Sequence, residues 1–220
     1  MLGDKIVVKK HHSEAAEGVY EILKDKIAGA RGRLAITVAG ESGSGKSEIA
    51  TEIGRIIEEK AGLKYVVFHQ DDYFIRPPKT NTEYRKKGLK HVGMHEVRLN
   101  LLDEHLKLAK NPQLLKGEKL KKPLIDYDKD AEVGEEIDLS DIKIAIAEGT
   151  YTTSLENADF KVFIDRTYIE TKGHRLERGR DKLDSYVEEI LKKEHEIISG
   201  HKKMADIIID ENYKASEARA

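Results

Sequence analysis

The chain contains no cysteine and no tryptophan, and it has only four prolines. Without cysteine there are no disulfides and no thiolate metal sites, which suits a cytoplasmic protein. No apolar run is long enough to span a bilayer, and residues 1–12 lack the apolar core of a secretory signal. The net charge of -2 provides no general attraction to nucleic acid. We therefore expect a cytoplasmic protein with neither a membrane nor a nucleic acid as its partner.

Strand-like and helix-like segments alternate along the 220 residues. The strand-like segments cover residues 34–39, 65–68, 142–147, 161–165 and 207–209. Such alternation is typical of an α/β fold with a doubly wound, mainly parallel sheet and helices on both faces. The length suits one domain with a sizeable core, so we expect residues 1–220 to form a single domain.

The remaining pattern predicts helices at the start of the chain and a different organisation in its middle. Ser13 is a plausible N-cap for a first helix. The alternation breaks over residues 71–130, where we expect a helix over 95–110 and a hairpin between apolar pieces around Leu115 and Leu124. We interpret residues 71–130 as a small insertion on the substrate side.

A phosphate-binding motif is the most informative feature of the chain. Residues 40–47 match G-x-x-x-x-G-K-S/T between an apolar strand and a segment with isoleucines at helical spacing. Glycines let backbone N–H groups turn towards phosphates, and the following helix points its positive end at them. Lys46 then reaches the β- and γ-phosphates and Ser47 holds Mg²⁺. The predicted nucleotide-binding residues are Gly40, Glu41, Ser42, Gly43, Ser44, Gly45, Lys46 and Ser47.

Carboxylates follow two of the predicted strands. Glu148 ends the segment 142–147, and Asp71 and Asp72 follow 65–68. Ligands of doubly wound sheets bind at the carboxyl ends of the strands, so Glu148 is placed near the Mg²⁺ of the phosphate loop. A carboxylate after the other strand accepts a proton from a substrate hydroxyl or helps to hold Mg²⁺. The alternatives are a solvated acid that opens a turn and a pair of capping acids.

Three arginines lie close together near the end of the chain. Arg175 and Arg178 share a helical face, and Arg180 follows Gly179. Guanidinium groups that close over a nucleotide stabilise the transferring phosphoryl group and exclude water. An exposed helix with many salt bridges is the alternative.

Together these segments resemble the uridine kinase and phosphoribulokinase family of P-loop kinases. Residues 70–74 read Q-D-D-Y-F and are similar to the family's Q-D-S-F-Y segment. Residues 147–151 read A-E-G-T-Y and are similar to its V-E-G motif, and residues 177–181 read E-R-G-R-D and are similar to its lid segment. Met204-Ala205-Asp206-Ile207-Ile208 is similar to the A-D-x-I-I ending. The resemblance implies a P-loop NTPase fold, ATP and Mg²⁺ as cofactors, Asp71 as catalytic base and a lid over residues 167–181.

The segments that bind the substrate depart from this family. Uridine kinases carry P-x-Y-D-F/Y-x-x-H, whose Tyr and His grip the nucleoside, and here Ile125 and Asp130 stand at those places. The uridine specificity is therefore not carried over. The candidate acceptor contacts are Asp72, Tyr73, His95, Tyr127, Thr150 and Tyr151. For His95 the alternative is an ordinary surface or core histidine.

We expect a Mg²⁺-ATP-dependent kinase that phosphorylates a hydroxyl of a small metabolite. A sugar-phosphate or pantothenate-type acceptor is the alternative among kinases. A nucleotide-switched regulator or GTPase predicts an N-K-x-D motif, which the sequence lacks. An RNA-linked NTPase predicts a basic groove with aromatics, and residues 85–90 are its only candidate. The sequence is compatible with a homo-oligomer as well as with a monomer.

Overall fold

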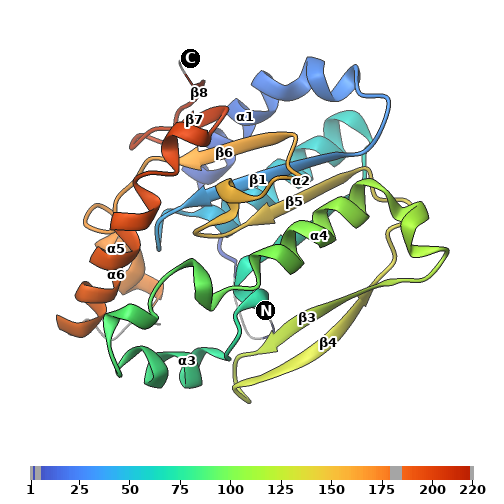
Figure 1. The fold of residues 1–220 in the computed structure, drawn as a ribbon. Helices are drawn as coiled ribbons and strands as arrows, with labels where there is room; N and C mark the ends of the chain where they lie inside the picture. Colours follow the sequence, from blue (N-terminus) through green and yellow to red (C-terminus); the bar gives the residue numbers. More distant parts are fainter. Residues whose placement is uncertain (1, 3–5, 179–184, 219–220) are drawn as a thin grey trace.

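The computed structural model describes residue 2 and residues 6–178 and 185–218 (Figure 1). In these residues a six-stranded sheet has the order β2-β5-β1-β6-β7-β8, and all its pairs are parallel except β7 with β8. The prediction of a mainly parallel, doubly wound sheet is confirmed. The strands are β1 (Leu34–Gly40), β2 (Tyr65–His69), β5 (Ile144–Glu148), β6 (Phe160–Ile164), β7 (Ile207–Ile209) and β8 (Ala215–Glu217).

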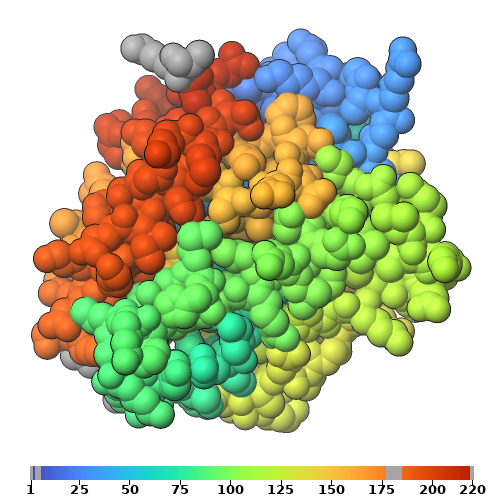
Figure 2. All heavy atoms as spheres, in the orientation of Figure 1, coloured from blue at the N-terminus to red at the C-terminus, as the bar shows by residue number. Residues whose placement is uncertain are grey.

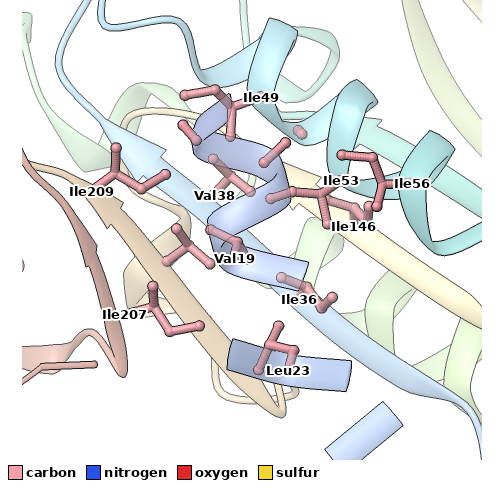
Figure 3. Packing of buried hydrophobic residues seen from close by; sticks show 14 of the residues in the cluster. Val19, Leu23, Ile36, Val38, Ile49, Ile53, Ile56, Ile146, Ile207 and Ile209 are labelled. Carbon is pink, nitrogen blue, oxygen red and sulfur yellow. The ribbon is translucent and has the colours of Figure 1, made fainter. Parts of the chain in front are cut away.

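One face of the sheet is covered by α1 (Lys10–Ala28) and α2 (Lys46–Ala61) (Figure 1). Figure 3 shows the core between them, where branched side chains of the helices interdigitate with those of the strands. Ile36 of β1 is paired in register with Ile146 of β5, and both are fully buried in this cluster. Branched residues suit strands because they pack well on a pleated surface.

The other face is covered by α4 (Leu99–Lys110), and the end of α6 (Ser185–Ile198) joins the same core. Side chains alternate along β1, so that Ala35 and Ala39 face this second cluster. Leu102 and Leu106 of α4 are fully buried in it. The small alanines leave room for the large leucines, and this fit brings α4 close to the sheet.

A smaller antiparallel sheet, formed by β3 (Leu120–Asp126) and β4 (Ala131–Ile137), lies beside the main one (Figure 1). Between β2 and this hairpin the chain forms α3 (Pro78–Arg85) and α4. The only other α-helix of the described residues is α5 (Lys172–Arg178). Figure 2 shows the green segment after α3 lying against the red α6, so the middle and the end of the chain meet on this face.

Several predicted boundaries are wrong. The first helix starts at Lys10 instead of after Ser13, because His12 Nδ1 accepts a hydrogen bond from Lys9 N–H at 3.1 Å. The helix predicted over 95–110 starts at Leu99. Met94–Glu96 form a separate 3₁₀ turn, in which Glu96 accepts a hydrogen bond from Gly93 N–H.

The hairpin joins Leu120–Asp126 to Ala131–Ile137 rather than the pieces around Leu115 and Leu124. Its second strand extends to Ile137, beyond residue 130. The antiparallel edge strand β8 is absent from the predicted strands because Ala215, Ser216 and Glu217 include no branched apolar residue. No helix among the described residues combines the length and apolar character needed to cross a membrane.

Candidate active site at the phosphate loop

The phosphate loop, residues 40–47, connects β1 to α2. Gly43 and Gly45 have φ angles of 78° and 92°, which side chains rarely adopt. A Cβ at Gly43 would lie 2.7 Å from Arg175 Cγ, and one at Gly45 would lie 2.8 Å from His12 Nε2. Both positions therefore require glycine, because of the backbone angle and because neighbouring side chains leave no room for a Cβ. The loop leads into the N-terminus of α2, where backbone N–H groups and the helix dipole favour an anion.

Lys46, Ser47 and Glu148 meet at the end of this loop. Ser47 Oγ donates a hydrogen bond to Glu148 Oε1 at 3.1 Å, and Lys46 Nζ donates to the carbonyl of Glu41 at 3.0 Å. An oxygen donor set of one hydroxyl and one carboxylate fits Mg²⁺, which uses few protein ligands and keeps waters and phosphate oxygens. The residues present thus fit a Mg²⁺–nucleotide.

His69 holds Glu148 in place from the neighbouring strand. The two residues are register partners on β2 and β5, and His69 Nδ1 lies 2.7 Å from Glu148 Oε1. Burial alone would disfavour the charged form of each, but the hydrogen bond between them prevails. It raises the pKa of His69 and, with Lys46 and Ser47, lowers the pKa of Glu148. The contact therefore favours the charged form of both side chains.

Asp71 lies in the 3₁₀ turn Gln70–Tyr73 directly after β2. The side chain of Asp71 opens into a cavity whose walls shield the carboxyl from bulk water. This shielding raises the pKa of Asp71, and the negative charge of Glu148 raises it further. Lys46 and His69 oppose this shift. A carboxylate with a raised pKa is a stronger proton acceptor.

A cavity of about 1020 Å³ brings these groups together. Its walls come from the phosphate loop, α3, α6, and the segments around Tyr127 and Thr150. Of the predicted site residues, those lining it are Ser42, Gly43, Lys46, Ser47, Asp71, Tyr127, Glu148, Thr150 and Arg175.

Four predicted acceptor contacts do not line this cavity. Asp72 is fully buried, where it accepts hydrogen bonds from Lys122 Nζ and Ile125 N–H. Tyr73 is also buried, and its hydroxyl lies 2.7 Å from His105 Nδ1. Tyr151 is buried in the core around α4, and His95 is exposed in the turn Met94–Glu96.

The predicted lid is described in part. Arg175 is 3% exposed, and its Nη1 donates to the carbonyl of Tyr168 and to Thr171 Oγ1. Its guanidinium thus braces the segment that contacts Gly43 of the phosphate loop. Arg178 is the last residue of α5, and Arg180 lies outside the described residues.

Glu41 has a role beyond its place in the loop. Its carboxylate accepts a hydrogen bond from Tyr168 N–H at 2.6 Å, and its other oxygen lies 2.6 Å from His195 Nδ1 of α6. The phosphate loop is thereby tied to the helix that forms the opposite wall of the cavity. His195 carries no signal of this contact in the sequence, since the two residues are 154 positions apart.

A polar network beside the cavity likewise carries no signal in the sequence. Arg85 Nε and Nη2 donate to the two oxygens of Glu96 at 2.7 and 2.9 Å, and Nη2 also donates to Glu194 at 3.1 Å. Arg85 belongs to the basic stretch considered for RNA binding. Its pairing with two carboxylates removes its charge from any basic groove.

Comparisons with known proteins agree with this geometry. A family model described as "Phosphoribulokinase / Uridine kinase family" matches residues 35–214. The uridine kinase of Ureaplasma urealyticum is 29% identical over 167 residues, covering 74% of this chain and 76% of that protein. The uridine kinase of Bacillus cereus strain B4264 is 30% identical over 192 residues, covering 81% and 85%.

Among solved structures, the D-glycerate 3-kinase of Cryptococcus neoformans is similar in fold, with a TM-score of 0.62 at 12% identity. That likeness covers 96% of this chain and 100% of the other. At this identity it concerns the fold alone. The phosphate loop, the parallel sheet and the match over residues 35–214 together show that the chain belongs to the phosphoribulokinase and uridine kinase family of P-loop kinases.

Proposed function

We propose that this chain transfers the γ-phosphoryl group of Mg²⁺-ATP to a hydroxyl of a small metabolite. The observation that carries the proposal is the shared cavity, in which Asp71 lies with Lys46 and Ser47 of the phosphate loop. Phosphoryl transfer requires a phosphate cradle, a metal site and a group that accepts the hydroxyl proton. All three lie within one enclosure of a size suited to a nucleotide and a small acceptor.

Each residue has a defined part in this reaction. The loop N–H groups and Lys46 hold the phosphates, and Ser47 and Glu148 hold Mg²⁺, with Glu148 oriented by His69. The Mg²⁺ held there would neutralise negative charge on the phosphates during transfer. Asp71 orients the acceptor hydroxyl and takes its proton as the oxygen attacks the γ-phosphorus, while the bond between the γ-phosphorus and the β,γ-bridging oxygen breaks to release ADP. The predicted lid would close over the phosphates and exclude water, with Arg175 bracing its segment against the phosphate loop.

Uridine is a poor acceptor under this proposal, although two of the similar proteins are named uridine kinases. Ile125 is fully buried in the hairpin. The carboxylate of Asp130 accepts hydrogen bonds from Lys79 N–H and Thr80 N–H, so it serves α3 rather than a ligand. Loss of two polar partners in a buried site weakens recognition by about 2–6 kcal/mol.

A screen of ADP formation tests the proposal. The acceptors are nucleosides, sugars, sugar phosphates, D-glycerate and pantothenate, each with Mg²⁺-ATP, and every reaction is repeated with Asp71→Asn. We expect phosphorylation of at least one non-nucleoside acceptor, and its loss in the variant. ATP consumption that no acceptor stimulates, or that Asp71→Asn leaves intact, would contradict the proposal. A kcat/KM for uridine of about 10⁴ M⁻¹s⁻¹ or more would contradict the altered specificity.

A further inference from the structure

The phosphate loop contains an acidic side chain, although its backbone is arranged to bind anions. Glu41 is the second residue of the loop, and its carbonyl accepts a hydrogen bond from Lys46 Nζ at 3.0 Å. The side chain of Glu41 is only 7% exposed. Charges interact more strongly where water is excluded, so an unbalanced carboxylate here would repel the phosphates of a nucleotide. The loop therefore requires a group that offsets the charge of Glu41.

Two groups meet the Glu41 carboxylate, one at each oxygen. Tyr168 N–H donates a hydrogen bond to Oε2 at 2.6 Å, and His195 Nδ1 lies 2.6 Å from Oε1. A carboxylate only accepts hydrogen bonds, so the proton of the second contact lies on His195. A protonated imidazole carries a full positive charge, which a backbone N–H does not. Of these two partners, His195 is thus the one that neutralises the acid.

The hydrogen bond from Tyr168 belongs to a wider contact between the loop and the start of the predicted lid. Thr171 Oγ1 donates to the carbonyl of Ser42 at 2.8 Å, and Gly43 packs against Arg175. Together with Glu41, three consecutive loop residues therefore hold this segment. The acid is useful to the fold, because it fixes the segment to the loop, but its charge opposes the binding of phosphates.

The imidazole ring of His195 is placed by α6 and by the side chain of Tyr168. The two ring centroids are 5.8 Å apart, and the ring planes are tilted by 57°. The side chain of His195 is 37% exposed, so its ring exchanges protons with water. Burial of an unpaired cation is costly, and this ring is both paired and partly hydrated. The helix α6 thus brings a cationic group to the loop without that cost.

We propose that His195 is a positioning residue for the nucleotide, which offsets the charge of Glu41 and thereby allows the phosphate loop to bind a polyphosphate. The inference rests on the nucleotide binding of the proposed function and adds a residue that lies outside the loop motif. His195 acts through Glu41, since it is not among the residues that line the cavity.

The alternative is that His195 is only a brace. Its hydrogen bond would then hold α6 against the loop, and the negative charge of Glu41 would have no part in the effect. The two explanations differ in one property, which is whether the contribution of His195 depends on the charge of Glu41 and on the charge of the ligand.

A double-mutant cycle separates the two explanations. Dissociation constants of Mg²⁺-ATP are measured by calorimetry for the wild type, His195→Ala, Glu41→Gln and the double variant. Glu41→Gln removes the charge but keeps an oxygen for Tyr168 N–H and an amide for the ring of His195. We expect His195→Ala to weaken binding by about 5- to 30-fold beside Glu41, and by less than about twofold beside the glutamine. A brace would give the same loss in both backgrounds.

The charge of the nucleotide provides a second readout. Mg²⁺-ATP is more negative than Mg²⁺-ADP, so the loss caused by His195→Ala should be greater for ATP than for ADP by about twofold or more. A brace predicts equal losses for the two nucleotides. His195→Asn keeps a hydrogen-bond donor but no charge, and it should weaken Mg²⁺-ATP in the same direction as His195→Ala. It replaces the alanine variant if that variant does not fold.

Lys192→Ala is the matched control, because it removes a positive charge from an exposed position of the same helix. Its affinity for Mg²⁺-ATP should stay within about twofold of the wild type. The inference is overturned if folded His195→Ala binds Mg²⁺-ATP as the wild type does, if its loss persists beside Glu41→Gln, if ATP and ADP lose equally, or if Lys192→Ala loses as much. In each case the kinase function stands. If the wild type does not bind Mg²⁺-ATP, both fall.

Discussion

The two ends of the cavity are built in different ways. At the nucleotide end, Lys46 and Ser47 come from one continuous loop, whose geometry is set by its own glycines and by the helix that follows. In the part of the cavity proposed to take the acceptor, Arg85 joins Glu96 and Glu194, and Arg85 and Glu194 are 109 positions apart. A short motif can encode the first kind of site, whereas the second exists only once α3 and α6 have packed together. The comparison predicts that substitutions in the phosphate loop lower activity, whereas substitutions in the Arg85 network lower the free energy of unfolding.

Lys46→Ala should have the largest effect on activity. Lys46 is only partly buried and contacts a loop carbonyl rather than the core, so the fold is retained while the phosphates lose their charged contact. We expect phosphoryl transfer to fall by at least about 10³-fold with an unchanged melting temperature. Single-turnover transfer and circular dichroism measure the two quantities. Activity within about tenfold of the wild type would contradict the assignment of the loop.

Asp71→Asn should act on kcat alone. The amide preserves the shape of the side chain, and Lys46 still holds the phosphates, so ATP affinity should be nearly unchanged. Loss of a positioned general base lowers kcat by roughly 10²- to 10⁴-fold. ATP affinity from calorimetry and kcat from single-turnover transfer separate the two contributions.

Asp72→Asn is the matched variant for Asp71→Asn, and the structure changes what is expected of it. Asp72 is fully buried and pairs with Lys122, so its substitution should lower the free energy of unfolding and leave kcat of the folded protein nearly intact. If Asp72→Asn were the inactive variant and Asp71→Asn remained active, the assignment of the base would be shifted by one residue.

Glu96→Gln should reveal the dependence of the acceptor end on tertiary packing. Glu96 is 1% exposed and accepts hydrogen bonds from Arg85, Asn81 and Gly93. Breaking this buried ion pair leaves Arg85 with Glu194 as its remaining carboxylate, so we expect a loss at the lower end of about 3–5 kcal/mol of unfolding free energy. Urea titration measures this loss.

The control for Glu96→Gln is Glu132→Gln. Glu132 forms a half-exposed pair with Arg98, and such pairs contribute at most about 1 kcal/mol. Equal losses in the two variants would mean that the network around Glu96 is no more important than a surface salt bridge. They would also remove the contrast between the two ends of the cavity.

The sequence was sufficient for the sheet and the nucleotide end because each depends on local patterns. Apolar strands, the glycines of the loop and the acids at strand ends all carry their meaning within a few residues. The residues expected to form the site include Lys46, Ser47, Asp71 and Glu148, and all four line the cavity. The roles of these residues stay predictions until they are measured.

The sequence was insufficient where long-range contacts decide the position of a side chain. Asp72 and Tyr73 follow Asp71 directly, yet both are buried. The chain forms a 3₁₀ turn there, and the two side chains reach Lys122 and His105 in the interior. The pairing of Arg85 with Glu194 and of Glu41 with His195 depends on where α6 packs. Neither spacing nor composition records such a contact.

The smallest predicted effect concerns His105, which supports the turn that carries Asp71. Its Nδ1 lies 2.7 Å from the hydroxyl of Tyr73, and burial, with a smaller contribution from Lys122, lowers the pKa of His105 from 6.5 to about 4. The folded protein therefore holds a neutral imidazole, while the unfolded chain takes up a proton below about pH 6.5. The resulting stability is fully present above pH 6.5 and is lost as the pH falls towards 4.

His105→Asn isolates this contribution, because the amide oxygen can accept the hydrogen bond from Tyr73 but does not titrate. Between pH 7.5 and pH 5 the wild type should lose about 1–2 kcal/mol more unfolding free energy than the variant, because only the unfolded wild-type chain takes up this proton over most of that range. Urea midpoints at both pH values give this difference. If His105→Asn shows the same pH dependence as the wild type, His105 does not titrate on unfolding, and acid lability near Asp71 must come from the carboxylates instead.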